Sequence, residues 1–211
     1  MFVGFKRLKI QPFKTNADGS VVPNGKLITI EGNPNKGATV QAEISGMSKD
    51  TKVISGSNIA YYISRKGDKE PKVEFEMLDI QQEDETRILG REETSNGVQL
   101  TGQNTEAPYC GIVMESNDGQ GNNAVIGMFY GVFSHDSDTL KTEEVGEDFT
   151  PENEKYTFTA SANPDNDTTF GGQYMAKYAG PNKEAIEEIN KRVLRTSAST
   201  EAVTKPTSDN Q

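Results

Sequence analysis

The sequence predicts a mainly β protein with one short helix in its middle and a second helix near its C-terminus. Apolar and polar residues alternate with a period of two over several short stretches, as in strands with one buried and one solvated face. Turn signals such as Asp18-Gly19, Asn24-Gly25 and Asn96-Gly97 separate these stretches, and 20 glycines are spread along the 211 residues. Many short strands joined by frequent turns are typical of a sandwich or a barrel.

Residues 38–45 give the clearest strand pattern. Val40, Ala42 and Ile44 fall on one face, which we expect to be buried, and the other face is polar, formed by Thr39, Gln41, Glu43 and Ser45. Residues 73–77 repeat this alternation, with Val73, Phe75 and Met77 expected inward. Further strands are expected at residues 3–13, 26–31, 58–65, 98–102, 108–116, 124–134, 139–145 and 155–161.

One expected strand, residues 125–133, is largely apolar on both faces. A strand of this kind is covered on both sides, by the core and by a further layer. That further layer comes either from the same chain or from a neighbouring subunit, and the pattern alone favours neither.

Two segments have the features of helices. Residues 79–89 are acidic at the start and end before Gly90, where a helix stops easily. Residues 182–195 place Ile186, Ile189 and Val193 on one stripe, with acidic residues early and basic residues late, as the helix dipole favours. The last segment, 196–211, is polar and lacks aromatic residues, so we expect a disordered tail.

Composition and charge exclude several classes of protein. The net charge of −10 argues against nucleic-acid binding, which needs clustered basic residues. The N-terminal residues lack the features of a signal peptide, and no apolar run is long enough to span a membrane. One cysteine cannot form an internal disulfide. We therefore expect a soluble protein made in a cytoplasm. Residues 1–30 carry five basic groups and one acid, whereas residues 91–150 carry two basic groups and eleven acids. This asymmetry fits either self-association or a solvated acidic surface.

No residue pattern satisfies the requirements of an active site. The glycines in 119–124 precede a strand rather than a helix, so this segment is expected to be a hairpin loop and not a dinucleotide site. His135 is the only histidine, and a lone Cys110 within an apolar stretch is usually a core residue. Glu74 and Glu76 share a strand face that is expected to be solvated. We therefore expect no enzyme activity, cofactor or metal, and a structural or binding role.

The order of several segments resembles the major tail proteins, or tail tube proteins, of long non-contractile-tailed phages infecting Gram-positive bacteria. The resemblance extends over about residues 3–162. The segments that resemble the family are residues 3–8, 37–46, 57–62, 88–91, 105–109 with 115–116, and 131–134 with 140–142. The resemblance implies a β-sandwich with a flanking short helix for residues 1–162, to which a C-terminal extension (163–195) and the tail (196–211) are added.

In that family, six subunits form a ring and stacked rings form the tube that delivers DNA, with one sheet of each subunit joining a continuous inner barrel. The polar face of Thr39, Gln41, Glu43 and Ser45 is then the candidate lumen wall. The candidate inter-ring loop contains Met47, Lys49, Asp50, Lys52, Val53 and Ile54. Phe129, Tyr130 and Phe133, from the doubly apolar strand, are the candidate subunit interface.

The resemblance also implies the partners. These are further copies of the chain, the tape measure protein, and the tail-tip and tail-terminator proteins, while DNA passes without specific binding and no membrane is involved. The protein would be made in the bacterial cytoplasm and would reside in the virion tail. The alternative is a monomeric module of the tail that binds carbohydrate or a cell surface. This module needs an exposed aromatic cluster, for which Tyr61, Tyr62 and Tyr174 are the candidates.

Overall fold

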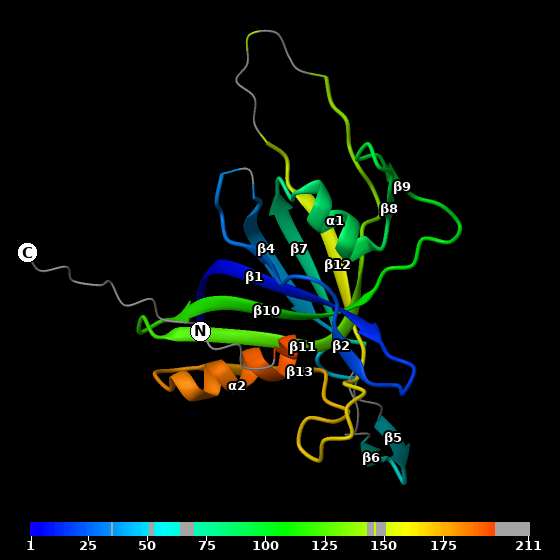
Figure 1. Cartoon of the computed structure of the whole chain (residues 1–211). Coiled ribbons are helices and arrows are strands. Elements are labelled where there is room, and N and C mark those ends of the chain that lie inside the picture. Colours follow the sequence, from blue (N-terminus) through cyan, green and yellow to red (C-terminus); the bar gives the residue numbers. More distant parts are fainter. Residues whose placement is uncertain (35, 51–52, 64–69, 143–145, 147–150, 197–211) are drawn as a thin grey trace, which may run out of the picture.

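The computed structural model in Figure 1 describes residues 1–34, 36–50, 53–63, 70–142, 146 and 151–196. Within these residues the chain forms thirteen strands and two helices. The strands are β1 (Phe2–Thr15), β2 (Val21–Pro23), β3 (Ile28–Ile30), β4 (Ala38–Ser45), β5 (Val53–Gly56), β6 (Ile59–Ile63), β7 (Lys72–Leu78), β8 (Glu92–Glu93), β9 (Gln99–Leu100), β10 (Tyr109–Asp118), β11 (Asn123–Ser134), β12 (Glu154–Ala160) and β13 (Met175–Ala179). The helices are α1 (Gln82–Leu89) and α2 (Lys183–Leu194). The predicted mainly β class with two helices is confirmed.

Most strands belong to one antiparallel sheet in the order β2-β1-β10-β11-β12-β7-β4. β3 adds to β1, and β13 adds to β11. The sheet bends so that its last strand returns to its first half, where the Thr39 hydroxyl donates to the Phe5 carbonyl at 2.9 Å. The β4–β7–β12 layer therefore packs across the β1–β10–β11 layer, and Figure 1 shows the two sets of strands crossing.

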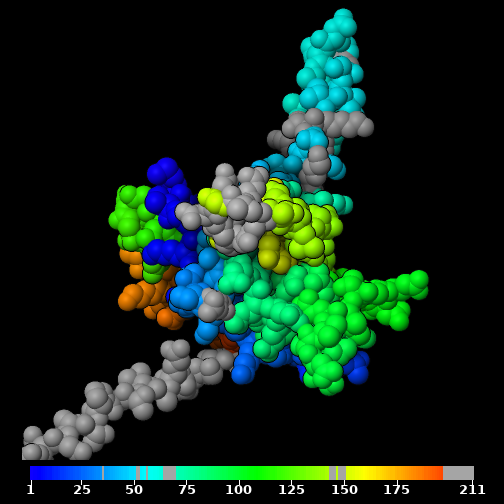
Figure 2. All heavy atoms as spheres, turned by 90° about the horizontal axis from the view of Figure 1, so that it is seen from above, coloured from blue at the N-terminus to red at the C-terminus, as the bar shows by residue number. Residues whose placement is uncertain are grey.

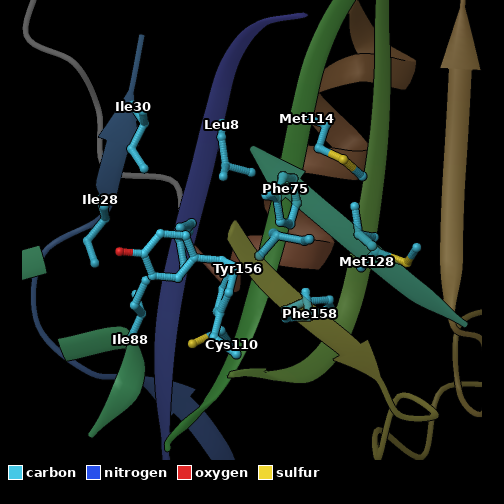
Figure 3. Packing of buried hydrophobic residues seen from close by; sticks show 14 of the residues in the cluster. Leu8, Ile28, Ile30, Phe75, Ile88, Cys110, Met114, Met128, Tyr156 and Phe158 are labelled. Atoms are coloured by element: carbon cyan, nitrogen blue, oxygen red, sulfur yellow. The ribbon is translucent and has the colours of Figure 1, made fainter. Parts of the chain in front are cut away.

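The main core fills the space between these two layers (Figure 3). Leu8 and Ile112 contribute from one layer, and Phe75, Tyr156 and Phe158 from the other, all with at most 2% of their surface exposed. Burying each large apolar side chain contributes about 1.5–3 kcal/mol. The layers are thus held by the inward faces that the alternation in the sequence predicts.

Helix α1 covers the end of the core beside β3 and β12. Its Ile88 and Leu89 are buried, and the chain leaves the helix through Gly90 with φ 64°. A side chain at Gly90 would place its Cβ 1.9 Å from the Glu106 carbonyl oxygen, so the close passage of residues 105–107 requires glycine here.

Helix α2 covers the other face of β10 and β11, and β13 extends the sheet along the first half of β11. Val113, Val125 and Phe129 form a second buried cluster with Ile189 and Val193 of the helix. The Asn182 side chain caps the helix by accepting from the Glu184 amide at 2.9 Å. The second layer over the doubly apolar strand is therefore supplied by the same chain, which settles the choice that the sequence left open.

Several local expectations were wrong. Residues 139–142 are irregular rather than a strand, and residues 143–145 lie outside the described residues. The short strands β2, β5, β8 and β13 were not expected. In β4 the register shifts between Thr39 and Gln41, so Thr39 is half-buried while Val40 is 43% exposed. A bulge moves the residues before it to the opposite face, which no alternation of residue types reveals.

Candidate assembly surfaces

The most exposed apolar surface is a hairpin that stands away from the body, formed by β5 and β6 and hereafter called the arm (residues 53–63). Figure 2 shows the arm projecting well beyond the rest of the molecule. Every described side chain of β6 is exposed, with Tyr61 at 79% and Ile59 at 62%. An isolated two-stranded hairpin is at best marginally stable in water, and this one carries apolar side chains that no described residue of the subunit covers.

The two faces of the arm differ in composition. Ile59, Tyr61 and Ile63 lie on one face because side chains alternate along a strand, and Val53 joins them because it pairs with Ile63. Tyr62 lies on the other face opposite Ile54. Tyr61 and Tyr62 therefore cannot form one flat stacking platform, and Tyr174 packs against the main core instead. The three tyrosines do not gather into the aromatic cluster that the carbohydrate-binding alternative needs.

The predicted inter-ring loop overlaps the arm. Val53 and Ile54 lie in β5, each 50% exposed, and Met47 is 49% exposed in the segment that precedes it. Lys49 and Asp50 are exposed in the same segment, and Lys52 lies outside the described residues. The strand expected at residues 58–65 is present as β6, whereas β5 was missed, because residues 53–56 were expected to belong to the loop. The apolar pair Val53 and Ile54 before a turn could have indicated a second strand of the arm.

The outer face of the β4–β7–β12 layer is polar. Gln41, Glu43 and Ser45 are exposed there, as the alternation predicted, whereas Thr39 has turned inward. β7 contributes Glu74 and Glu76 to the same face, and together with β12 these residues line a shallow depression of about 260 Å³. The charged side chains of this face are three carboxylates and two lysines: Glu43, Glu74, Glu76, Lys72 and Lys155.

One contact on this face works against folding. Glu43 lies directly opposite Glu74 in the β4–β7 register, and like charges in that position destabilise a strand pair. The neighbouring Glu76 is better compensated, since Asn153 donates to it at 3.0 Å and the Lys155 ammonium lies 3.6 Å away. The Glu43–Glu74 pair thus has no stabilising role in the isolated subunit.

The predicted subunit-interface residues are mostly used within the chain. Phe129 packs under α2 and Phe133 packs in the main core, and each is only 2% exposed. Because both side chains are buried within the subunit, neither can contact a neighbouring subunit, and the prediction that they form the subunit interface is wrong. Tyr130 is half-buried and stacks on Tyr109 with ring centroids 4.1 Å apart, and for Tyr130 the prediction stays open.

Cys110 and His135 do not form a catalytic pair. Burial raises the pKa of the Cys110 thiol to about 12, and this thiol donates to the Pro108 carbonyl. The His135 ring stacks on Tyr156 and bonds to Asp138 at 2.7 Å and to the Lys155 carbonyl at 2.9 Å. Within the described residues, no group of three or more histidine, cysteine or carboxylate side chains is arranged to hold a metal ion.

The glycine-containing segment 119–122 is the turn between β10 and β11, as predicted. Asp118 accepts from the amides of Gln120 and Asn122, each at 2.8 Å, and closes the hairpin. Neither helix of the described part of the chain is long and apolar enough to cross a membrane.

The described residues thus form a mainly β protein that exposes an apolar arm. The family model described as phage tail tube protein matches residues 23–188, and the chain belongs to this family. The chain is therefore a structural component of a phage tail. The matched range includes the arm, the polar face and the first half of α2. No match was found among curated proteins or among solved structures.

Proposed function

We propose that six copies of this chain form a ring, and that the rings stack into the tail tube through which DNA reaches the host. Membership of the family supports the tube. The arm supports assembly, because its apolar side chains need a cover that the described part of the subunit does not supply. The role is structural, without catalysis or a cofactor.

The polar face of the β4–β7–β12 layer is the proposed lumen wall, with Gln41, Glu43 and Ser45 at its centre. A channel that passes a polyanion works best without clusters of lysine and arginine, because each phosphate contact adds to adhesion. The excess of carboxylates over lysines on this face fits that requirement. The repulsive Glu43–Glu74 pair has an explanation here, since it serves DNA passage rather than subunit stability.

If the β4–β7–β12 layer faces the lumen, the positions of the other layers relative to the tube axis follow. The main core lies behind the lumen wall, the β1–β10–β11 layer lies behind the core, and α2 covers the far side of β10 and β11. Helix α2, and with it the proposed C-terminal extension 163–195, would therefore lie on the outer surface of the tube.

Neighbouring subunits in a ring would join through the free edge of β4. Within the described residues β4 pairs along its length with β7 alone and touches β1 only around Thr39. Residues 41–45 therefore present unpaired backbone groups, which a strand of a neighbouring copy can satisfy. Tyr130 and its stacked partner Tyr109 offer a second lateral contact.

The arm, with Met47, Lys49, Asp50, Lys52, Val53 and Ile54, would reach the adjacent ring. The other partners proposed by resemblance are the tape measure protein inside the tube, the tail-tip complex and the tail terminator. Synthesis in the cytoplasm of a Gram-positive host and a long non-contractile tail belong to the same proposal.

Negative-stain electron microscopy over a concentration series of the purified protein tests this function. Hollow rings or tubes with six-fold end views are expected, either spontaneously or after addition of the tail-tip complex. Dispersed monomers at every concentration, with and without that complex, would overturn the proposal and favour a monomeric binding module.

A further inference from the structure

The segment that follows β11 is held to the body through the single histidine of the chain. The His135 side chain is only 3% exposed and stacks on the Tyr156 ring of β12, with ring centroids 4.5 Å apart. Its Nδ1 atom lies 2.9 Å from the Lys155 carbonyl oxygen, and its Nε2 atom lies 2.7 Å from a carboxylate oxygen of Asp138. One imidazole ring thus joins Asp138 to β12.

Both hydrogen bonds of this ring can form together only when the ring is protonated. A carbonyl oxygen and an ionised carboxylate accept hydrogen bonds and donate none, whereas a neutral imidazole carries a single N–H. When Nδ1 donates to the Lys155 carbonyl, a neutral ring presents the lone pair of Nε2 to the Asp138 carboxylate, and that contact is repulsive. The imidazolium donates from both nitrogens, so the arrangement requires one proton more than the neutral ring holds.

The charged groups around the ring favour this extra proton. Asp138 is ionised, because the hydrogen bond from the ring holds the pKa of this carboxyl below its usual range. Glu85 of α1 and Glu154 of β12 lie on the far side of Tyr156, whose hydroxyl is 3.4 Å from Glu85 and 3.0 Å from Glu154. The Arg91 guanidinium pairs with Glu85 at 3.0 Å and offsets part of its charge.

The ring itself is the group of this cluster that changes its charge near neutral pH. Burial lowers the pKa of His135, but the hydrogen bonds to Asp138 and to the Lys155 carbonyl outweigh this and raise the pKa above 6.5. Burial raises the pKa of the Tyr156 hydroxyl, which keeps its proton and donates it. The Lys155 ammonium is directed away from the ring, toward Glu76 at 3.6 Å.

Residues 136–142 depend on the histidine because few other bonds hold them. Within the described residues, no backbone hydrogen bond joins this segment to the body, and its other polar contact is the ion pair of Lys141 with Glu152. Asp136 and Ser137 line the shallow depression on the polar face of the β4–β7–β12 layer. The position of this segment therefore determines one wall of the depression.

We infer that His135 is a proton-operated latch, which holds residues 136–141 against β12 when the ring is charged and releases them when it is neutral. The latch is a property of the subunit and does not depend on the proposed tube. It is fully closed below pH 6.5 and opens as the pH rises through the higher folded-state pKa of the ring. Opening would remove Asp136 and Ser137 from the wall of the depression.

Nuclear magnetic resonance of the ring and of the segment tests the latch. Because the chain has one histidine, ¹⁵N-labelled histidine gives two ring signals that need no assignment, in solution for subunits and by magic-angle spinning for tubes. Both ring nitrogens should carry protons at about pH 6, and only Nδ1 should do so at about pH 9. Over the same range the backbone order parameters of residues 136–141 should fall from about 0.85 to below about 0.6. A ring that titrates at or below pH 6.5, or order parameters that do not change, would overturn the latch.

Asp138→Asn separates the latch from a general effect of pH. The Asp138 side chain is 75% exposed, so the variant should fold normally. Its amide can donate to Nε2 of a neutral ring and can accept from a charged one, so residues 136–141 should stay ordered over the whole titration. The ring should also titrate at lower pH than in the wild type.

Asp136→Asn is the matched control, because it removes an exposed carboxylate of the same segment that makes no bond to the ring. This variant should keep the loss of order at high pH. An unchanged loss of order in Asp138→Asn, or the disappearance of the pH response in Asp136→Asn, would contradict the role of the His135–Asp138 bond.

Discussion

Two antiparallel hairpins of this chain are both rich in apolar residues, yet they end in opposite environments. β10 and β11 are covered on one face by the main core and on the other by α2, so Val113 and Met128 are fully buried. β5 and β6 carry a similar share of apolar side chains, and all of the described ones are exposed. The two hairpins differ in what covers them: α2 of the same chain covers β10 and β11, whereas no described residue of the chain covers the arm.

The comparison separates stability from assembly. Apolar burial within β10–β11 stabilises the folded subunit in isolation, whereas burial of the arm would contribute only on assembly, when the proposed neighbouring copy covers it. Substitutions in the first hairpin should therefore unfold the protein, and substitutions in the second should leave a folded subunit that does not assemble.

The largest effect is expected for Val193→Asp at the contact of α2 with β10 and β11. Val193 is fully buried, so a carboxylate there would lose the packing of the second cluster and would be left without a partner. The free energy of unfolding should fall by more than about 3 kcal/mol. Denaturant unfolding followed by circular dichroism measures this, with the exposed Glu187→Gln in the same helix as a control that should change little. An unchanged midpoint for Val193→Asp would show that α2 does not serve as the cover.

The double variant Val53→Ser/Ile54→Ser should abolish tubes while leaving the subunit folded. Both side chains are half exposed in the subunit, so the free energy of unfolding should change by less than about 0.5 kcal/mol. Electron microscopy and denaturant unfolding of the same preparation give the two readouts. Unimpaired tubes from this variant would refute the role of the arm, and a large loss of stability would show that the arm is part of the fold.

Glu43→Lys should stabilise the subunit slightly and impair delivery. The new lysine faces Glu74 across the strand pair and replaces a repulsion with an attraction, a gain of about 0.2–1 kcal/mol. On the proposed lumen wall the same lysine would hold phosphates and slow DNA passage. Glu43→Gln should keep part of the stability gain without the delay. Normal genome delivery by phage carrying Glu43→Lys would contradict a lumen position for this face.

The smallest effect concerns His135, which joins Asp138 to the Lys155 carbonyl of β12. Burial of the His135 ring lowers its pKa, but the hydrogen bonds to Asp138 and the Lys155 carbonyl outweigh this and raise the pKa above its usual 6.5. The folded state therefore holds the proton more tightly than the unfolded state. The resulting stabilisation is complete below pH 6.5 and is lost as the pH rises through the folded-state value.

Unfolding experiments at pH 6 and pH 8 measure this contribution, which should be smaller than about 1 kcal/mol. Asp138→Asn should remove most of the pH dependence over this range. A pH dependence that persists unchanged in Asp138→Asn would show that another group causes it.

The sequence predicted most of the sheet because alternation is a local signal. The bounds of β4 were predicted to the residue, and β10 and β11 to within about two residues. The bulge in β4 was missed, since it depends on how Thr39 meets the carbonyl of Phe5, a residue distant in sequence. The doubly apolar pattern of β11 showed that a cover exists and not which chain supplies it.

Of the candidate assembly surfaces, the sequence predicted only those that depend on local alternation. The polar face of β4 followed from residue types alone, except for Thr39. In the arm, β6 was predicted as a strand, whereas β5 was expected only as part of a loop, because it is only four residues long. Phe129 and Phe133 were assigned to an interface because a buried strand and a subunit contact have the same apolar composition.

Electron cryo-microscopy of assembled tubes tests the central claim most directly, since it shows what covers the arm. The account predicts tubes in which β4, β7 and β12 line the lumen, α2 lies outside, and each arm contacts a subunit in the next ring. Tubes in which every arm folds back on its own ring, with α2 facing the lumen, would contradict it.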